Sequence, residues 1–310
     1  MICSAPTNPD SDGKPFGPIC IRIADISTSL ISESDGPQIR LDSTAKIFLA
    51  DDQAPDIRVR ASWRQKLHSP DAPGIFDSGA LWQLYRDGDR HTFTFISPKY
   101  GRTPYKIAHF DASFESGEIF LSRECFGADE QLYPLEYPLD ELIMMNLLAA
   151  GRGVEIHSSG IITPEGQGLI FAGQSGAGKT TISRLWQAET GADILSDDRI
   201  IIRKRNGQFW MYGTPWHGEA ALASSKGTPL NAIFFLRQAM KNEIVSQSNA
   251  VTAARLLACG FPPFYDPAGL EFTLGFYDEL TTSIPCAELG FVPDLTAIDC
   301  VRSLASRGRL

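Results

Sequence analysis

The stretch that most constrains this chain is an eight-residue run at positions 173–180, which reads Gly-Gln-Ser-Gly-Ala-Gly-Lys-Thr. It has the form G-x-x-x-x-G-K-[ST], in which glycines let backbone N–H groups converge on a phosphate with no side chain in the way. The apolar residues 169–172 before it are typical of a short buried strand, and apolar residues recur at helical spacing after it. Strand, glycine loop and helix in this order predict an α/β unit that binds nucleotide phosphates.

The side chains of this P-loop are expected to divide the binding of ATP and Mg²⁺ between them. Lys179 is predicted to bridge the outer phosphates, and the Thr180 hydroxyl to ligate Mg²⁺. The N-terminus of the following helix adds partial positive charge. The residues predicted to bind ATP are Gly173, Gln174, Ser175, Gly176, Ala177, Gly178, Lys179, Thr180 and Thr181.

A pair of adjacent carboxylates, Asp197 and Asp198, follows the apolar residues Ile194 and Leu195. P-loop proteins need a carboxylate at the end of a neighbouring strand, either to hold the Mg²⁺ shell or to activate the attacking group. An ordinary helix or turn cap is the competing interpretation, but two like charges side by side are costly unless cations lie nearby. One Asp is therefore expected to bind Mg²⁺ and the other to accept a proton from an attacking hydroxyl, and this pattern does not separate the two roles.

The composition limits the classes of partner. The 310 residues carry a net charge of −9 and 43% hydrophobic residues, which indicates a globular protein whose main partner is not nucleic acid. No apolar run is long enough to span a bilayer, and the N-terminus lacks the features of a signal peptide. The six cysteines include no C-x-x-C pair, so reduced thiols in the cytoplasm are expected, with neither a zinc site nor a redox pair.

The residue pattern of the first part of the chain is typical of a β-rich domain. Residues 1–17 read as a loose tail, and residues 18–136 as a β-rich N-terminal domain with no catalytic signature. Alternation at 19–23 and 57–62, and a hairpin pattern over 81–96, predict a half-buried antiparallel sheet. Ser116-Gly117 is expected to lie between two further strands.

Residues 137–310 alternate between strand and helix patterns and are assigned to a second domain. A helix is expected to begin at Tyr137-Pro138 and to end at Gly151, before a strand over 154–162. Asn206-Gly207 predicts a hairpin, and residues 232–236 a buried strand. Helices are expected over 248–257, closed by Gly260, and over 296–305.

The P-loop in the form G-x-S-G-x-G-K-T, followed by a strand that ends in Asp-Asp, resembles the HPr kinase/phosphorylase and phosphoenolpyruvate carboxykinase superfamily over about residues 138–240. His157 matches a histidine that the HPr kinase-related proteins place on the strand before the P-loop. The layout is similar to kinases found with peptide-modifying clusters, including lasso peptide kinases, which phosphorylate a serine hydroxyl. The resemblance implies an α/β fold with α+β character, in which a P-loop kinase domain with a mixed sheet follows the β-rich domain.

The same resemblance implies site roles. The Asp pair serves metal binding and base catalysis in those families, with Asp197 favoured as base and Asp198 as metal ligand, and His157 would help to position the nucleophile or a phosphate. An ordinary structural histidine is the competing interpretation of His157. The glycine-rich signature of the bifunctional enzyme is replaced here by Gly-Thr-Pro-Trp-His-Gly-Glu at 213–219, so phosphorylase activity and HPr as a substrate are not implied.

That replaced segment supplies the predicted acceptor contacts, from Trp216, His217 and Glu219. The loop is expected to present an aromatic surface, a titratable ring and a carboxylate. An ordinary turn, in which the aromatic side chain only fills space, fits the same residues. Arg199 and Arg237 each follow an apolar run and could reach a phosphate, but ordinary surface arginine is the favoured interpretation of both.

These features together predict a kinase that transfers the γ-phosphate of ATP, with Mg²⁺, to a serine-type hydroxyl of a peptide or protein. Two alternatives stay open: a P-loop NTPase that couples hydrolysis to motion or assembly, and a nucleotide-regulated binding module. The identity of the acceptor and the oligomeric state do not follow from the sequence.

Overall fold

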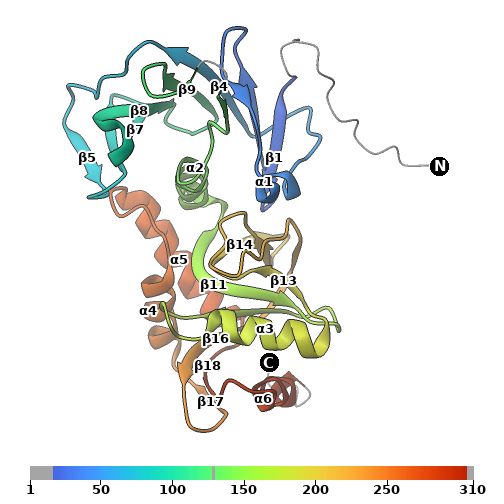
Figure 1. Ribbon diagram of the computed structural model, residues 1–310. Helices are drawn as coiled ribbons and strands as arrows, with labels where there is room; N and C mark the ends of the chain where they lie inside the picture. The colour runs from blue at the N-terminus through green and yellow to red at the C-terminus, as the bar shows by residue number, and fades with distance from the viewer. Residues whose placement is uncertain (1–16, 128–129, 306–310) are drawn as a thin grey trace.

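The computed structural model describes residues 17–127 and 130–305, so the predicted tail lies outside the described residues except for Gly17 (Figure 1). Two large sheets are connected through helix α2 (Leu139–Leu147), which lies between them. Both sheets mix parallel and antiparallel pairs, which confirms the predicted mixed α/β architecture in outline.

Among the residues that the structure describes, the first sheet has eight strands and is formed by the N-terminal part of the chain. In spatial order they are β1 (Ile19–Ile23), β2 (Ile26–Ser32), β4 (Ile57–Arg64), β9 (Ser116–Ser122), β8 (Gly101–Phe110), β7 (Arg90–Ser97), β6 (Trp82–Asp87) and β5 (Gly74–Asp77). The predicted hairpin is confirmed as β6–β7, with its turn at Gly88, whose φ is 56°. Two short strands, β3 (Gln38–Ile39) and β10 (Gln131–Leu132), pair separately beside α1 (Ser43–Ile47).

Two expectations for this sheet are wrong. Strand β4 pairs in parallel with both β2 and β9, because its spatial neighbours are reached through long connections rather than hairpins. Ser116-Gly117 begins β9 instead of separating two strands, and the turn precedes it at Phe114, whose φ is 59°. Gly117 is required inside the strand because a Cβ there would overlap the ring of Phe110.

The second sheet surrounds the P-loop. Its order is β12 (Gly168–Ala172), β11 (Val154–Ile162), β14 (Arg199–Arg205), β15 (Gln208–Gly213), β16 (Gly227–Gln238), β18 (Cys286–Phe291) and β17 (Glu243–Ser246), with β13 (Asp193–Ser196) on β11. Strand β12 also pairs with β16, which closes five strands into a ring. The β14–β15 hairpin turns at Asn206-Gly207, both with positive φ, as predicted.

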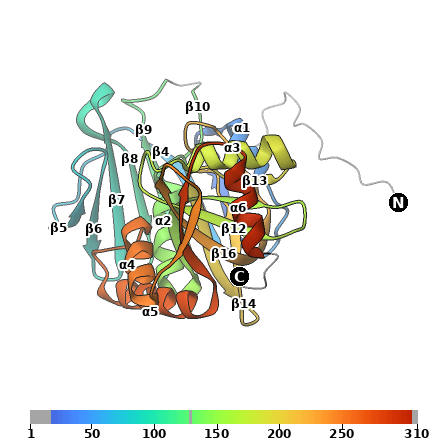
Figure 2. The ribbon, with the colours of Figure 1, turned by 90° about the horizontal axis from the view of Figure 1, so that it is seen from below.

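Within residues 17–127 and 130–305, four further helices cover this sheet, and they lie on two sides of it (Figure 2). Helices α3 (Lys179–Thr190) and α6 (Thr296–Ala305) pack on one hydrophobic cluster, and α4 (Asn249–Cys259) and α5 (Pro267–Ser283) on another. The predicted helices α2, α4 and α6 are confirmed, and Ser248 caps α4 as expected. Helix α5 and strand β18 were not predicted, although Asp266 caps α5 directly before Pro267. No helix in the described ranges is long and apolar enough to cross a membrane.

Helix α2 belongs to the hydrophobic cluster of the first sheet, together with Ile201, Tyr212 and Trp216 from the second half of the chain. The side chains of α2 therefore pack against strands on both sides of position 136, where the sequence predicts a domain boundary. The division into domains stays a prediction.

Candidate functional site

The P-loop has the local structure that its sequence predicts. Strand β12 ends at Ala172, and α3 begins at Lys179. Gly176 and Gly178 have φ values of 80° and 104°, a region that favours glycine. A Cβ at Gly178 would also lie 2.5 Å from the ring of Phe291 on β18, so this position has no room for a side chain.

A cavity of about 400 Å³ lies beside the loop. Its wall consists of residues 173–177 together with side chains from β16 and α4. Gln238 donates a hydrogen bond to the Gly176 carbonyl at 2.9 Å. Arg255 adds a cation to the wall and is held by Glu288 at 2.7 Å. Sequence reasoning missed Arg255, because nothing near it in the chain marks a nucleotide pocket.

Lys179 is bent back onto its own loop. Its Nζ donates to the carbonyl oxygens of Gly173 at 2.9 Å and Gln174 at 3.3 Å, and the residue is 7% exposed. Burial lowers the pKa of Lys179, and the charges of Asp198 and Asp197 act in the opposite direction. The fold thus brings the P-loop lysine into the electrostatic field of the Asp pair.

The carboxylate of Asp197 is tied to the loop after β15. It is 2% exposed, and its two oxygens accept N–H bonds from Gly218 at 2.9 Å and Ala220 at 3.0 Å. A Cβ at Gly218 would lie 2.9 Å from the same carboxylate, so glycine allows this close approach. Asp197 therefore joins the end of β13 to the segment that was predicted to bind the acceptor.

Asp198 has a different environment and is half-buried. His157 Nε2 donates to its Oδ1 at 2.8 Å, and Arg199 contacts its other oxygen. Burial alone would raise the pKa of Asp198, but the hydrogen bond from His157 and the charge of Arg199 outweigh burial and lower it. His157 lies opposite Arg199 in the β11–β14 pairing, and Asp198 directly precedes Arg199. This pairing explains how His157 and Asp198 meet although they are 41 positions apart.

Arg199 is the centre of a buried ion-pair cluster, so the surface interpretation of it is wrong. Its guanidinium contacts Glu141 at 2.9 Å and Glu155 at 3.5 Å as well as Asp198, and it lies over the ring of Phe261. Burial and the nearby Glu141 raise the pKa of Glu155 well above its ordinary value.

The surface interpretation is confirmed for Arg237, whose side chain is 44% exposed and contacts Glu243 and Glu288. Neither Glu141 nor Glu155 was predicted as part of the site. Glu141 lies with Asp140 in the first turn of α2, where the helix dipole favours acidic residues, so its position in the chain carries no signal for a site.

A second cavity, of about 410 Å³, begins at Asp198 and Arg199. Its wall includes α1, the segment before α2 and the loop after β15, and the lining residues are Asp42, Thr44, Ala45, Tyr133, Glu136, Tyr137, Asp140, Asp198, Arg199, Pro215, Trp216 and His217. Burial raises the pKa of Asp140 on this wall to about 7. The cavity therefore joins the catalytic carboxylate candidate to residues from the N-terminal part of the chain.

The predicted acceptor residues differ in their positions. Trp216 is 6% exposed and packs with α2 and the first sheet, so the expected aromatic surface is wrong, although this residue lines the cavity. His217 is exposed on the cavity wall, with Nδ1 3.0 Å from the Gly218 carbonyl oxygen. Glu219 is exposed and outside the cavity lining.

Comparison with known proteins gives one match to a family model and a distant match to a solved structure. A family model described as "SynChlorMet cassette protein ScmC" matches residues 139–260, which include the P-loop and the Asp pair. The HPr(Ser) kinase/phosphatase from Coxiella burnetii aligns over 41% of this chain and 92% of its own length, at 14% identity and a TM-score of 0.20. None of the curated proteins matches the chain. The chain is thus similar to ScmC in one segment and distantly similar to an HPr kinase/phosphatase.

Proposed function

We propose that this protein is an ATP- and Mg²⁺-dependent kinase that transfers the γ-phosphate to a serine hydroxyl of a peptide or protein. One observation carries the proposal. The half-buried carboxylate of Asp198 lines the second cavity, and its charge acts on Lys179 of the P-loop. A base that lines an acceptor cavity and acts electrostatically on a phosphate-binding lysine suits transfer to an alcohol.

The P-loop residues supply the nucleotide contacts in this proposal. Backbone N–H groups of residues 173–178 and the Lys179 ammonium bind the phosphates of ATP. No group of three or more His, Cys, Asp or Glu within the described ranges could hold a metal alone. The Thr180 hydroxyl and an Asp carboxylate nevertheless fit Mg²⁺, which takes oxygen ligands and shares its shell with phosphates and water. When bound, Mg²⁺ would neutralise charge on the phosphates.

We assign proton abstraction to Asp198, which reverses the order that the family resemblance favours. Both Asp197 oxygens accept backbone N–H groups in a buried position, whereas Asp198 lies on the cavity wall. The lowered pKa keeps Asp198 ionised at neutral pH, and His157 fixes its orientation. Asp197 then remains as the carboxylate for Mg²⁺.

The reaction balances with these residues. The serine oxygen forms a bond to the γ-phosphorus, the bond from that phosphorus to the bridging oxygen breaks, and ADP leaves. The hydroxyl proton passes to Asp198. His217 and the exposed rim of the second cavity contact the peptide on either side of the serine.

The test follows the label of γ-labelled ATP in the presence of Mg²⁺, with and without serine peptides. Transfer to serine is expected, and Lys179→Ala should abolish it. Asp198→Asn should lower kcat by at least about 10²-fold, the usual scale for a positioned base. Asp278→Asn, on the exposed side of α5, is the matched control and should keep the wild-type rate.

Other outcomes select the alternatives. Release of the label only as free phosphate, with every hydroxyl acceptor offered, would replace the kinase with an NTPase. ATP binding without any release would leave a nucleotide-regulated binding module. His217→Ala and Glu219→Ala should raise the acceptor KM with little change in ATP affinity.

A further inference from the structure

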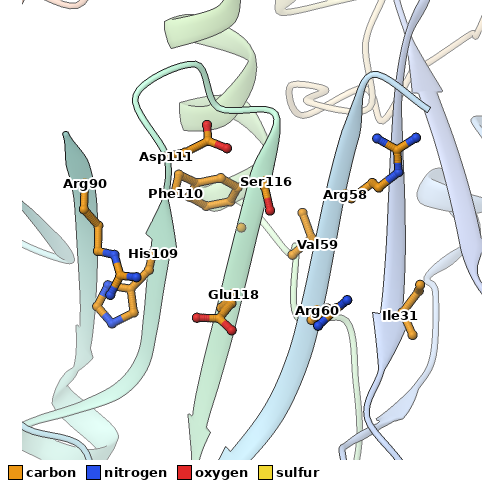
Figure 3. Close-up of a pocket in the computed structure, with 11 residues that line it drawn as sticks. Ile31, Arg58, Val59, Arg60, Arg90, His109, Phe110, Asp111, Ser116 and Glu118 are labelled. Carbon is orange, nitrogen blue, oxygen red and sulfur yellow. The ribbon is translucent and has the colours of Figure 1, made fainter. Parts of the chain in front are cut away.

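The outer face of the first sheet carries a groove of about 480 Å³, which shares no residue with the two cavities of the candidate site (Figure 3). Alternate residues on β4 divide between two environments. Ile57, Val59 and Ala61 are buried toward α2, whereas Arg58 and Arg60 point to the opposite, exposed face. The groove therefore lies on the far side of the sheet from α2.

The strand register arranges charged side chains in rows across this face. In the strand register, Arg60 on β4 lies opposite Glu118 on β9, and Glu118 lies opposite His109 on β8. Arg58 pairs with Ser116 in the neighbouring row. Figure 3 shows these residues on adjacent strands, with Arg90 beside His109.

The groove arginines lack internal partners. Within the described part of the chain, Arg58, Arg60 and Arg90 form no ion pair and no side-chain hydrogen bond, in a protein whose net charge is −9. By contrast, Arg199 and Arg255 in the second half of the chain contact carboxylates. Three guanidinium groups in one concave surface therefore leave unused donors for an anionic ligand.

We propose that this groove binds an extended acidic segment of a partner polypeptide, with carboxylates at every second residue. Arg58 and Arg60 are two residues apart on one strand face, which places them about 7 Å apart along the strand. Side chains on one face of an extended peptide repeat at the same distance of about 7 Å. Each guanidinium can bind one carboxylate through two parallel N–H bonds.

The groove favours a peptide over a nucleic acid. The carboxylates of Asp111 and Glu118 lie in the same groove as the arginines and would repel a continuous chain of phosphates. A peptide can place single carboxylates at the arginines and neutral or basic side chains beside Asp111 and Glu118. Ile31, which is exposed at the groove edge and pairs with Arg60, adds an apolar contact.

The experiment measures binding directly, so it does not depend on the proposed kinase activity. Two fluorescein-labelled peptides of equal composition are titrated with the full chain at low salt and followed by fluorescence polarisation. One alternates Glu and Thr, and the other has the same residues as a Glu block and a Thr block. The alternating peptide should bind more tightly, and Arg58→Glu with Arg60→Glu should weaken it by at least about tenfold.

The matched control is Arg40→Glu with Arg102→Glu, which changes the net charge equally at exposed sites outside the groove. This variant should bind within about twofold of the wild type, because distant surface charges are screened. The proposal is overturned by equal losses in the two variants, by equal affinity for both peptides, or by tighter binding of a single-stranded oligonucleotide. If the double Glu variant fails to fold in thermal melts, the double Ala variant takes its place.

Discussion

Replacement of Arg199 by Met tests the idea that the ion-pair cluster beside the candidate site is an essential part of the fold. The change keeps much of the side-chain volume but removes the guanidinium from Glu141, Glu155 and Asp198. The side chains of Arg199, Glu141 and Glu155 are 15%, 12% and 1% exposed. Removing one partner of such a buried pair leaves uncompensated carboxylates and should cost about 3–5 kcal/mol of unfolding free energy.

Arg237→Met is the matched control for this prediction. Arg237 also contacts two carboxylates, Glu243 at 2.8 Å and Glu288 at 2.7 Å, but its side chain is 44% exposed. Solvent screens such contacts, so the expected loss is small and well below that of Arg199→Met. The difference between the two variants therefore reports the effect of burial rather than the number of contacts.

Urea denaturation at neutral pH, followed by tryptophan fluorescence, measures both losses. Adding Glu155→Gln to the Arg199→Met variant should recover part of the stability, because it removes one of the carboxyl groups left without a cation. The reasoning is refuted if Arg199→Met costs no more than Arg237→Met, or if Glu155→Gln increases the loss. An unchanged dependence of free energy on urea would show that the comparison is between similar unfolded states.

The remaining predictions concern backbone space and pH. Gly178→Ala should lower the free energy of unfolding by about 2–4 kcal/mol in thermal or urea denaturation, because its φ is positive and the new Cβ would overlap the ring on β18. Gly176→Ala has open space around its Cβ and should show only the backbone strain of about 1 kcal/mol. Equal losses in the two variants would contradict this prediction. Burial raises the pKa of Glu155 in the folded state. The contribution of this carboxyl to the free energy of unfolding is therefore complete below its pKa in the unfolded chain, about 4.5, and is lost as the pH rises above that value. Glu155→Gln should therefore remove a decline in stability of at most about 1.4 kcal/mol per pH unit, and an unchanged pH profile would show that the carboxyl ionises normally. The pKa of Asp198 is lowered in part by the hydrogen bond from His157, so its ionised form is lost only as the pH falls through that lowered value. His157→Phe removes this hydrogen bond and should move the acidic limb of the kcat–pH profile to higher pH. An unmoved limb would exclude His157 as the partner of Asp198.

The sequence by itself determined the features that depend on residues close together in the chain. The P-loop between β12 and α3, the Asn206-Gly207 hairpin and the Ser248 cap of α4 are all set by short-range backbone geometry, and all are present in the structure. The end of β13 at the Asp pair was equally readable. Helix α5 carried a comparable signal at Asp266 and Pro267, but the residues buried along it include glycine and threonines, which weakens its apolar pattern.

The tertiary structure alone decided which distant residues complete the site. Glu141 and Arg199 are 58 positions apart, and Glu155 reaches the same guanidinium because β11 pairs with β14. The burial of Trp216 depends on α2 and on strands of the first sheet.

The parallel pairing of β4 with β2 and β9 was likewise not predictable from local patterns, because long connections separate these strands in the chain. Local patterns specify helix, strand and turn because hydrogen bonds and steric limits act within a few residues. Burial of apolar surface and compensation of buried charge act across the whole fold, so they select partners that no short stretch of sequence identifies.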